Sequence, residues 1–121
     1  MTSIGYFFAM LAAAAAPSDA QLTDAMVTYG RCMDEAGVAL ERSGEAADSV
    51  AKAASLRCAH ELEAVVELQK AIFAASEPTK SLVDKHGDRA IAPWILSTRK
   101  RIEGWGIGRA MAAIIEVRAG R

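Results

Sequence analysis

The two cysteines constrain the fold of this chain most, because each lies in a helical pattern and a turn separates them. On both sides of the turn, apolar residues recur every three or four positions, which is the spacing of one helix face. Gly44 disfavours helix and Ser43 is a good N-cap, so we expect the chain to turn there. Cys32 and Cys58 are equidistant from Glu45. In an antiparallel helix pair they would lie at the same height, where a disulfide can form.

A disulfide in this position would stabilise the hairpin by about 3–4 kcal/mol through loop closure. The alternative is a pair of buried free thiols, because cysteine is often simply a small core residue. Export to an oxidising compartment favours the disulfide. The spacing therefore predicts a Cys32–Cys58 disulfide if the chain is exported.

The N-terminus has the pattern of a secretory signal peptide over residues 1–20. Ile4 to Ala16 is an apolar run without charge, and it is shorter than the roughly 20 residues that cross a bilayer. Cleavage after Ala16 or Ala20 fits the small residues there, and we favour Ala20 because the other cut leaves Pro17 first. The pattern lacks the usual Lys or Arg near residue 1, so an uncleaved anchor or a buried first helix are alternatives. A cleaved chain would be periplasmic or secreted.

Composition and periodicity predict an all-α fold. Hydrophobic residues make up 52% of the chain, many of them alanine, and no stretch alternates like a strand. We expect a small helical bundle built on a disulfide-linked antiparallel hairpin over residues 21–76, followed by basic helices over 78–119. The expected helices run from about 22 to 36 or 41, from 46 to 75 and from 79 to 86, and one more begins near Pro93.

Three alternating glycines, Gly104, Gly106 and Gly108, stand in the last helical pattern. Each would cost about 1 kcal/mol relative to alanine inside a helix. The glycines therefore either break the helix or let another backbone approach closely.

Charge is divided between the two halves of the chain. Residues 21–78 carry five basic and ten acidic side chains, whereas residues 79–121 carry nine and four. One interpretation is that the halves attract each other within one bundle. The other is a basic surface that contacts an anionic membrane or polyanion. The overall charge of −1 gives no general attraction to nucleic acid. The residues of this basic surface would be Arg99, Lys100, Arg101 and Arg109.

The sequence offers little catalytic chemistry. His60, Glu63 and Glu67 share one side of a helix and form a weak metal candidate, but a site would need ligands from another helix. The cysteines lack C-x-x-C spacing, no nucleophile motif is present, and the glycines do not match a dinucleotide fingerprint. We therefore predict no catalytic residue and no cofactor.

Trp94, Ile102 and Trp105 fall on one predicted helical stripe, where they serve either as core or as contacts for a partner. The sequence favours a non-enzymatic structural or interaction protein of the cell envelope, with a homo-oligomer or an envelope protein as partner. The alternatives are a binder of membrane surfaces or polyanions, and a metal-binding protein or enzyme.

Overall fold

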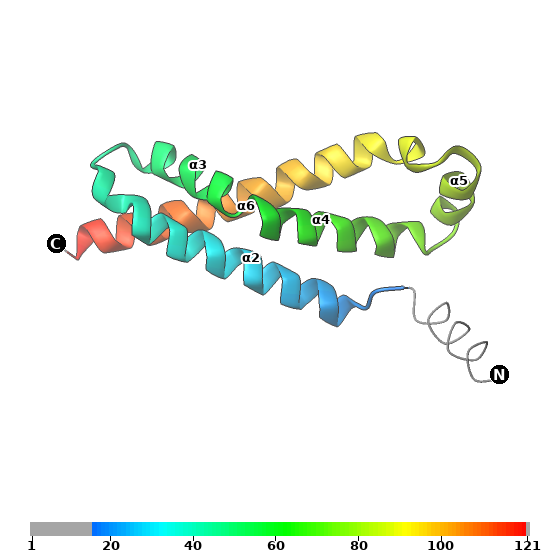
Figure 1. Ribbon diagram of the computed structural model, residues 1–121, viewed down its shortest axis with the longest axis horizontal. Coiled ribbons are helices and arrows are strands. Elements are labelled where there is room, and N and C mark those ends of the chain that lie inside the picture. The colour runs from blue at the N-terminus through cyan, green and yellow to red at the C-terminus, as the bar shows by residue number, and fades with distance from the viewer. Residues whose placement is uncertain (1–15, 121) are drawn as a thin grey trace, which may run out of the picture.

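The computed structural model describes residues 16–120, and these form an all-α fold, as predicted (Figure 1). Most of the predicted signal peptide lies outside the described residues. Within residues 16–120, none of the helices combines the length and apolar character needed to cross a bilayer. The elements are α2 (Asp19–Leu40), the 3₁₀ turn η1 (Glu41–Ser43), α3 (Ala47–Arg57), α4 (Ala59–Ala74), α5 (Thr79–His86), the 3₁₀ turn η2 (Asp88–Ala90) and α6 (Ala92–Ala119).

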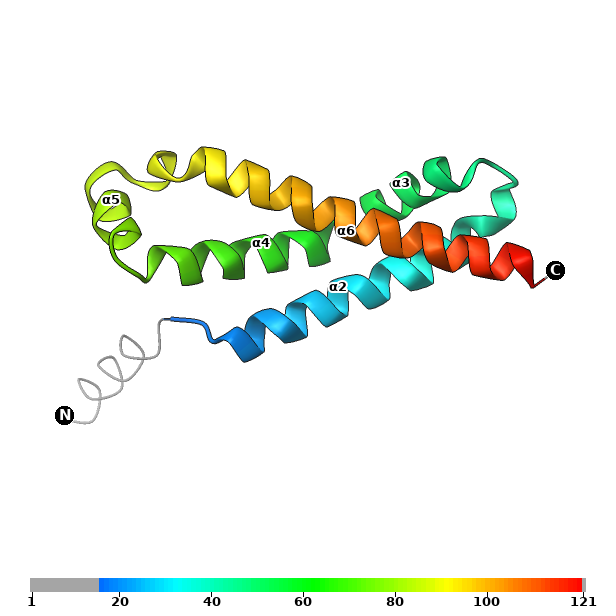
Figure 2. The same ribbon diagram turned by 180° about the vertical axis from the view of Figure 1, so that it is seen from behind.

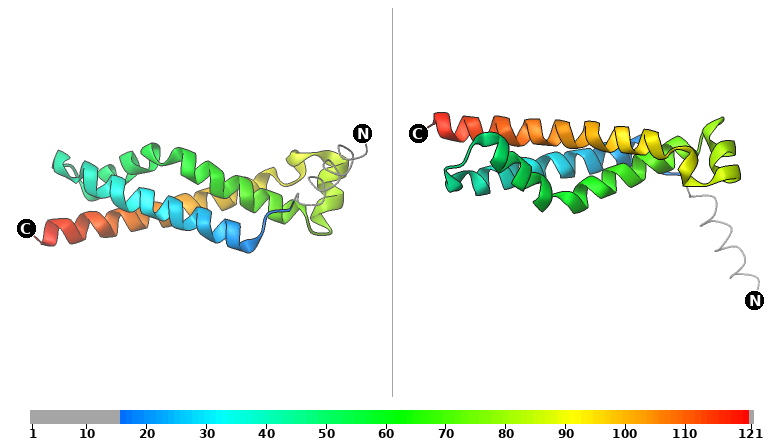
Figure 3. Two further views of the ribbon diagram at one scale, coloured as in Figure 1. Left: turned by 60° about the horizontal axis from the view of Figure 1, so that its bottom comes forward. Right: turned by 90° about the horizontal axis from the view of Figure 1, so that it is seen from above.

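The helices form an elongated bundle of two layers. Helix α6 has 28 residues, about 42 Å at 1.5 Å per residue, and it makes one layer alone. Helix α2 and the consecutive α3 and α4 make the other layer, as the right-hand view of Figure 3 shows. The short α5 closes one end, and the C-terminus lies at the opposite end, near the turn between α2 and α3 (Figure 2). The first half of α6 therefore lies on α4, and its second half lies on α2 and α3.

Local sequence signals set most helix ends. Ser18 caps α2 in a reciprocal capping box: its Oγ accepts from the Gln21 N–H at 3.2 Å, and the Gln21 side chain accepts from the Ser18 N–H at 2.7 Å. Gly44 follows η1 and Gly87 follows α5, both at φ 73°, a region that favours glycine. Pro93 lies in the first turn of α6, where its missing N–H costs nothing.

The single helix predicted over 46–75 is wrong, because the structure divides it into α3 and α4 at Cys58. Cys58 has φ −99° and ψ 18°, outside the helical region. Its N–H still donates to Ala54 O at 3.0 Å, and its carbonyl accepts from Leu62 N–H at 3.1 Å. Hydrogen bonding therefore continues on both sides while the chain bends.

The core is built mainly from medium and small side chains, where α6 packs on α2, α3 and α4. Tyr29 and Met33 of α2 are fully buried, as is Ile114 of α6. Small residues let the helix axes approach: a Cβ on Gly37 would lie 3.1 Å from the carbonyl oxygen of Ala110. The other buried apolar side chains are Ala36, Val50, Ala51, Ala54, Cys58, Leu62, Val65, Val66, Ile91, Ile102 and Ala110.

The glycine run does not break α6, which continues from Ala92 to Ala119. Gly106 faces the buried Tyr29, and a Cβ there would lie 2.6 Å from Tyr29 Cζ. Gly104 and Gly108 face open space. A break in the helix is therefore wrong, and the close neighbour at Gly106 is the Tyr29 side chain, not another backbone as expected.

Candidate functional site

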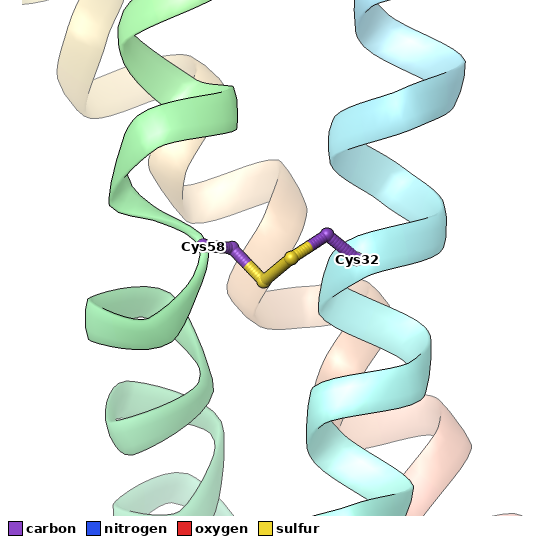
Figure 4. Close-up of a disulfide and its surroundings, with 2 residues drawn as sticks. All are labelled: Cys32 and Cys58. Atoms are coloured by element: carbon purple, nitrogen blue, oxygen red, sulfur yellow. A yellow bond between two sulfur atoms is a disulfide. The ribbon is translucent and has the colours of Figure 1, made fainter.

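The predicted Cys32–Cys58 disulfide is present, and it ties the middle of α2 to the bend between α3 and α4 (Figure 4). The two Cα atoms lie 6.0 Å apart, within the range that a disulfide spans. Cys58 is fully buried and Cys32 is half-buried. A disulfide indicates an oxidising, extracytoplasmic location.

A groove of about 430 Å³ opens beside the disulfide, between α2 and the start of α4. Glu61 lies at the groove, and one of its carboxylate oxygens comes within 4.8 Å of both cysteine sulfurs. Oε2 of Glu61 is buried and accepts no hydrogen bond within residues 16–120. The groove is lined by Thr28, Arg31, Cys32, Glu35, Ala36, Ala39, Arg57 and Glu61.

The predicted contact residues divide into two environments. Trp94 is half-buried and stacks on Phe73, with ring centroids 3.9 Å apart and planes 18° apart. Ile102 is buried in the core. Trp105, in contrast, keeps 41% of its surface exposed although α6 is unbroken around it. The structure therefore leaves Trp105 as the exposed member of the stripe.

Trp105 is held by side chains of α2 and by its own helix. Its ring lies against Tyr29, with centroids 6.2 Å apart, and the Arg109 guanidinium lies 5.2 Å from the ring centroid. Arg109 Nε donates to Asp34 Oδ1 at 3.1 Å, and its Nη2 donates to the other carboxylate oxygen. This fork raises the pKa of Arg109 above its ordinary value, and the first cause is the hydrogen bond to Asp34. Gly30 completes the arrangement because a Cβ there would meet Arg109 and Trp105. We call Tyr29, Gly30, Asp34, Trp105 and Arg109 the Trp105 cluster.

The basic residues of α6 are engaged mainly inside the molecule. Arg99 donates to Glu63 of α4 through its two terminal nitrogens, Nη1 and Nη2, and Arg109 pairs with Asp34 as described above. Near the C-terminal end of α6, Arg118 Nη2 donates to the Glu45 carbonyl at 2.7 Å. These contacts join the basic half of the chain to its acidic half. The other two residues of the predicted basic surface, Lys100 and Arg101, are exposed.

The predicted metal candidate is not where metal-ligating atoms gather in the described part of the chain. Glu63 is engaged by Arg99, and His60 and Glu67 are exposed on α4. The atoms that lie close enough to share an ion belong instead to Cys32, Cys58 and Glu61. Sequence reasoning missed Glu61, although it lies one helical turn after Cys58. It also missed Asp34 and Tyr29, whose partners on α6 lie far away in the sequence.

Comparison with known proteins adds no information about these residues. No protein-family model, no curated protein and no solved structure matches this chain.

Proposed function

We propose that this protein is an exported, non-enzymatic interaction module, and that it contacts a partner protein through the Trp105 cluster. The observation that carries the proposal is that Trp105 is exposed and is also in contact with neighbouring side chains. The ring is 41% exposed, yet it is in contact with Tyr29 and Arg109. Tryptophan, tyrosine and arginine are the residues that most often dominate the energy of protein interfaces.

The ion pair between Arg109 and Asp34 supports the proposal because it fixes the position of Arg109 in the free protein. An ordered side chain loses less conformational entropy on binding, which commonly costs about 0.5–1.5 kcal/mol for each immobilised flexible side chain. A bidentate pair also fixes the orientation of the guanidinium over the ring. The cluster is thus preorganised for binding.

A shallow groove of about 350 Å³ continues this surface toward the C-terminus of α6. The small side chains of Ala112 and Ala113 line this groove. Its charged lining residues are Asp34, Arg109 and Glu116. Such a surface suits an apolar side chain of a partner, with polar groups at the rim. A partner protein of the cell envelope or a second copy of this chain would fit this chemistry.

Export is part of the proposal, and the disulfide together with the apolar N-terminal segment supports it. The capping box adds a consideration about the cleavage point. A cut after Ala20 would remove Ser18 and the first two residues of α2, whereas a cut after Ala16 would keep the cap. Both cleavage points remain part of the proposal.

Binding of a membrane surface or polyanion has less support. Arg99 and Arg109 are already paired with carboxylates, which leaves Lys100 and Arg101 as exposed cations of the predicted basic surface. Attraction of that kind weakens as salt is added, because exposed charges are screened within about 10 Å at 0.1 M. Binding that persists at high salt would favour the Trp105 cluster.

The experiment compares Trp105→Ala with Leu56→Ala, because Leu56 is an apolar side chain with 82% exposure on α3. The oxidised protein is tested for self-association by sedimentation, and for capture of proteins from an extract of its own cell envelope. We expect Trp105→Ala to weaken association by about 30-fold or more, the loss typical of an interface hot spot. Leu56→Ala should bind like the wild type. Loss of binding in Leu56→Ala alone would move the contact to α3 and contradict the proposal.

A further inference from the structure

Glu61 places a buried acceptor beside the disulfide, and the disulfide has no hydrogen to donate. Oε2 of Glu61 is buried and without a hydrogen-bond partner in residues 16–120. A buried polar group without a hydrogen-bond partner destabilises the fold, and more so when the group is charged. Reduction of the disulfide would change this environment, because it produces two thiols that can donate a proton or bind a cation.

We propose that Cys32, Cys58 and Glu61 form a redox-gated site for a thiophilic divalent cation such as Zn²⁺. A dithiol reductant gives two electrons and two protons to the disulfide, and the reductant itself becomes a disulfide. The S–S bond is then replaced by two S–H groups. When the cation binds, both thiol protons leave to solvent, and the two sulfurs and the Glu61 carboxylate become its ligands. A disulfide oxidant reverses the cycle: it takes two electrons from the two thiolates and two protons from solvent, and so becomes a dithiol. The Cys32–Cys58 bond forms again, two ligands are lost and the cation is released.

The geometry fits tetrahedral coordination. Zinc–sulfur bonds of about 2.3 Å and zinc–oxygen bonds of about 2.1 Å place ligand atoms about 3.6–3.8 Å from one another. The three ligand atoms here already lie within 4.8 Å of one another, and the cysteine Cα atoms are 6.0 Å apart. Side-chain rotation can therefore bring the ligands to these distances. The groove beside Cys32 gives water access to the fourth position.

The charges around the site favour the loaded form. Two thiolates, one carboxylate and a divalent cation carry a net charge of −1. Arg31 and Arg57 line the same groove and can stabilise a negative complex. Cys58 directly precedes α4, where the positive end of the helix dipole favours a negative charge. This site is separate from the Trp105 cluster, so the proposed interaction does not depend on it.

The test uses the full chain, which is reduced with a phosphine under anaerobic conditions. The reduced protein is then titrated with Zn²⁺ in competition with a chromophoric chelator. We expect one Zn²⁺ per reduced chain and none for the oxidised chain. Co²⁺ should give a thiolate charge-transfer band in the reduced protein. Glu61→Gln should weaken Zn²⁺ binding by about 10-fold or more, comparable to the losses seen when ligand support is removed. Two control variants, Glu35→Gln in the same groove and His60→Ala beside Glu61, should leave the affinity within about twofold.

Several outcomes would overturn the proposal. Zn²⁺ binding by the reduced chain no tighter than by a Cys32→Ser/Cys58→Ser variant would exclude the cysteines as ligands. Equal losses in Glu35→Gln and Glu61→Gln would show that only the overall charge matters. Circular dichroism separates binding from folding: a reduced chain that unfolds and regains its helices with Zn²⁺ supports the site, and one that stays unfolded with Zn²⁺ contradicts it.

Discussion

Gly106 determines how closely α6 approaches α2, because the buried Tyr29 ring occupies the space that a side chain would need. A Cβ on Gly106 would lie 2.6 Å from Tyr29 Cζ. A Cβ on Gly104 or Gly108 would instead point into open space. All three glycines lie within α6 and share the same helical backbone, so they form a matched set for mutation.

We expect Gly106→Ala to destabilise the protein by about 1–3 kcal/mol, because overpacking a well-filled core costs more than the helix propensity that alanine adds. Gly104→Ala and Gly108→Ala should each stabilise it by about 0.5–1 kcal/mol. Urea unfolding of the three variants measures these changes. Equal stabilisation by all three substitutions would show that the contact with Tyr29 is not tight.

Ionisation of the Tyr29 phenol should lower the stability of the protein at alkaline pH. Burial, and secondly the nearby Glu103, raise the pKa of Tyr29 to about 12, compared with about 10 in an unfolded chain. The fold therefore favours the neutral phenol. The contribution is fully present below about pH 10 and is lost as the pH rises toward about 12.

We expect the free energy of unfolding of the wild type to fall between about pH 10 and pH 11.5, by up to about 2 kcal/mol more than that of Tyr29→Phe. The comparison removes contributions that both proteins share, such as lysine titration. At neutral pH, Tyr29→Phe should be as stable as the wild type or slightly more stable, because the Tyr29 hydroxyl is buried without a hydrogen-bond partner in the described residues. Parallel pH curves would rule out the assigned role of the phenol.

Among the helices, α2 depends on Ser18 for its beginning. Ser18→Ala removes one of the two reciprocal bonds of the capping box and should cost about 1 kcal/mol in urea unfolding. Ser49→Ala is the control, because Ser49 is exposed inside α3 and alanine has the higher helix propensity. Its stability should be unchanged or slightly raised. If Ser18→Ala unfolds in urea like the wild type, the first turn of α2 is frayed in solution.

The helices were predictable from sequence where the signal was local. The turn at Gly44 and the start of α6 at Pro93 each depend on close chain neighbours, and both were predicted. The bend at Cys58 was not predicted, because the apolar spacing of residues 51–62 stays in phase across it. The disulfide that ties this point to α2 is a tertiary contact, and tertiary contacts override helix propensity. The contact between Gly106 and Tyr29 was not predicted for the same reason, because the two residues are distant in sequence.

The candidate site was predictable in part. Trp105 was identified from the pattern of the last helix, and the cysteine pair from its symmetric spacing. Arg109 was identified only as a contact for an anionic membrane or polyanion, not as a neighbour of Trp105. The grouping of Trp105 with Tyr29 and Asp34 depends on the alignment of α6 with α2, which no motif encodes. For the same reason, the sequence did not predict that one oxygen of Glu61 is buried beside the two sulfurs.

At the scale of the whole molecule, the disulfide limits the freedom of the unfolded chain more than any other contact. It closes a loop with a sequence separation of 26, which corresponds to about 3–4 kcal/mol in the chain-entropy model. We expect Cys32→Ser/Cys58→Ser to lose about that much stability to urea. Reduced wild-type protein without metal should lose a similar amount. A loss below about 1 kcal/mol would show that the core alone holds the bundle together.

The long α6 unites the bundle through charge as well as packing. Arg99, Arg109 and Arg118 each reach an acidic segment of the first half of the chain. The Arg99–Glu63 and Arg109–Asp34 pairs are partly exposed, and such pairs commonly contribute only about 0–1 kcal/mol each. Arg118 differs, because its partner Glu41 is buried. Their larger effect is orientation, because together they align α6 with α4 and α2 and bring Trp105 to Tyr29.

Export of the protein and the Cys32–Cys58 disulfide can be tested together by the intact mass of the protein from its native host. The sample is alkylated without reduction before measurement. We predict a chain that begins at Pro17 or Gln21, with neither cysteine alkylated. A full-length chain with two alkylated cysteines would contradict both export and the disulfide.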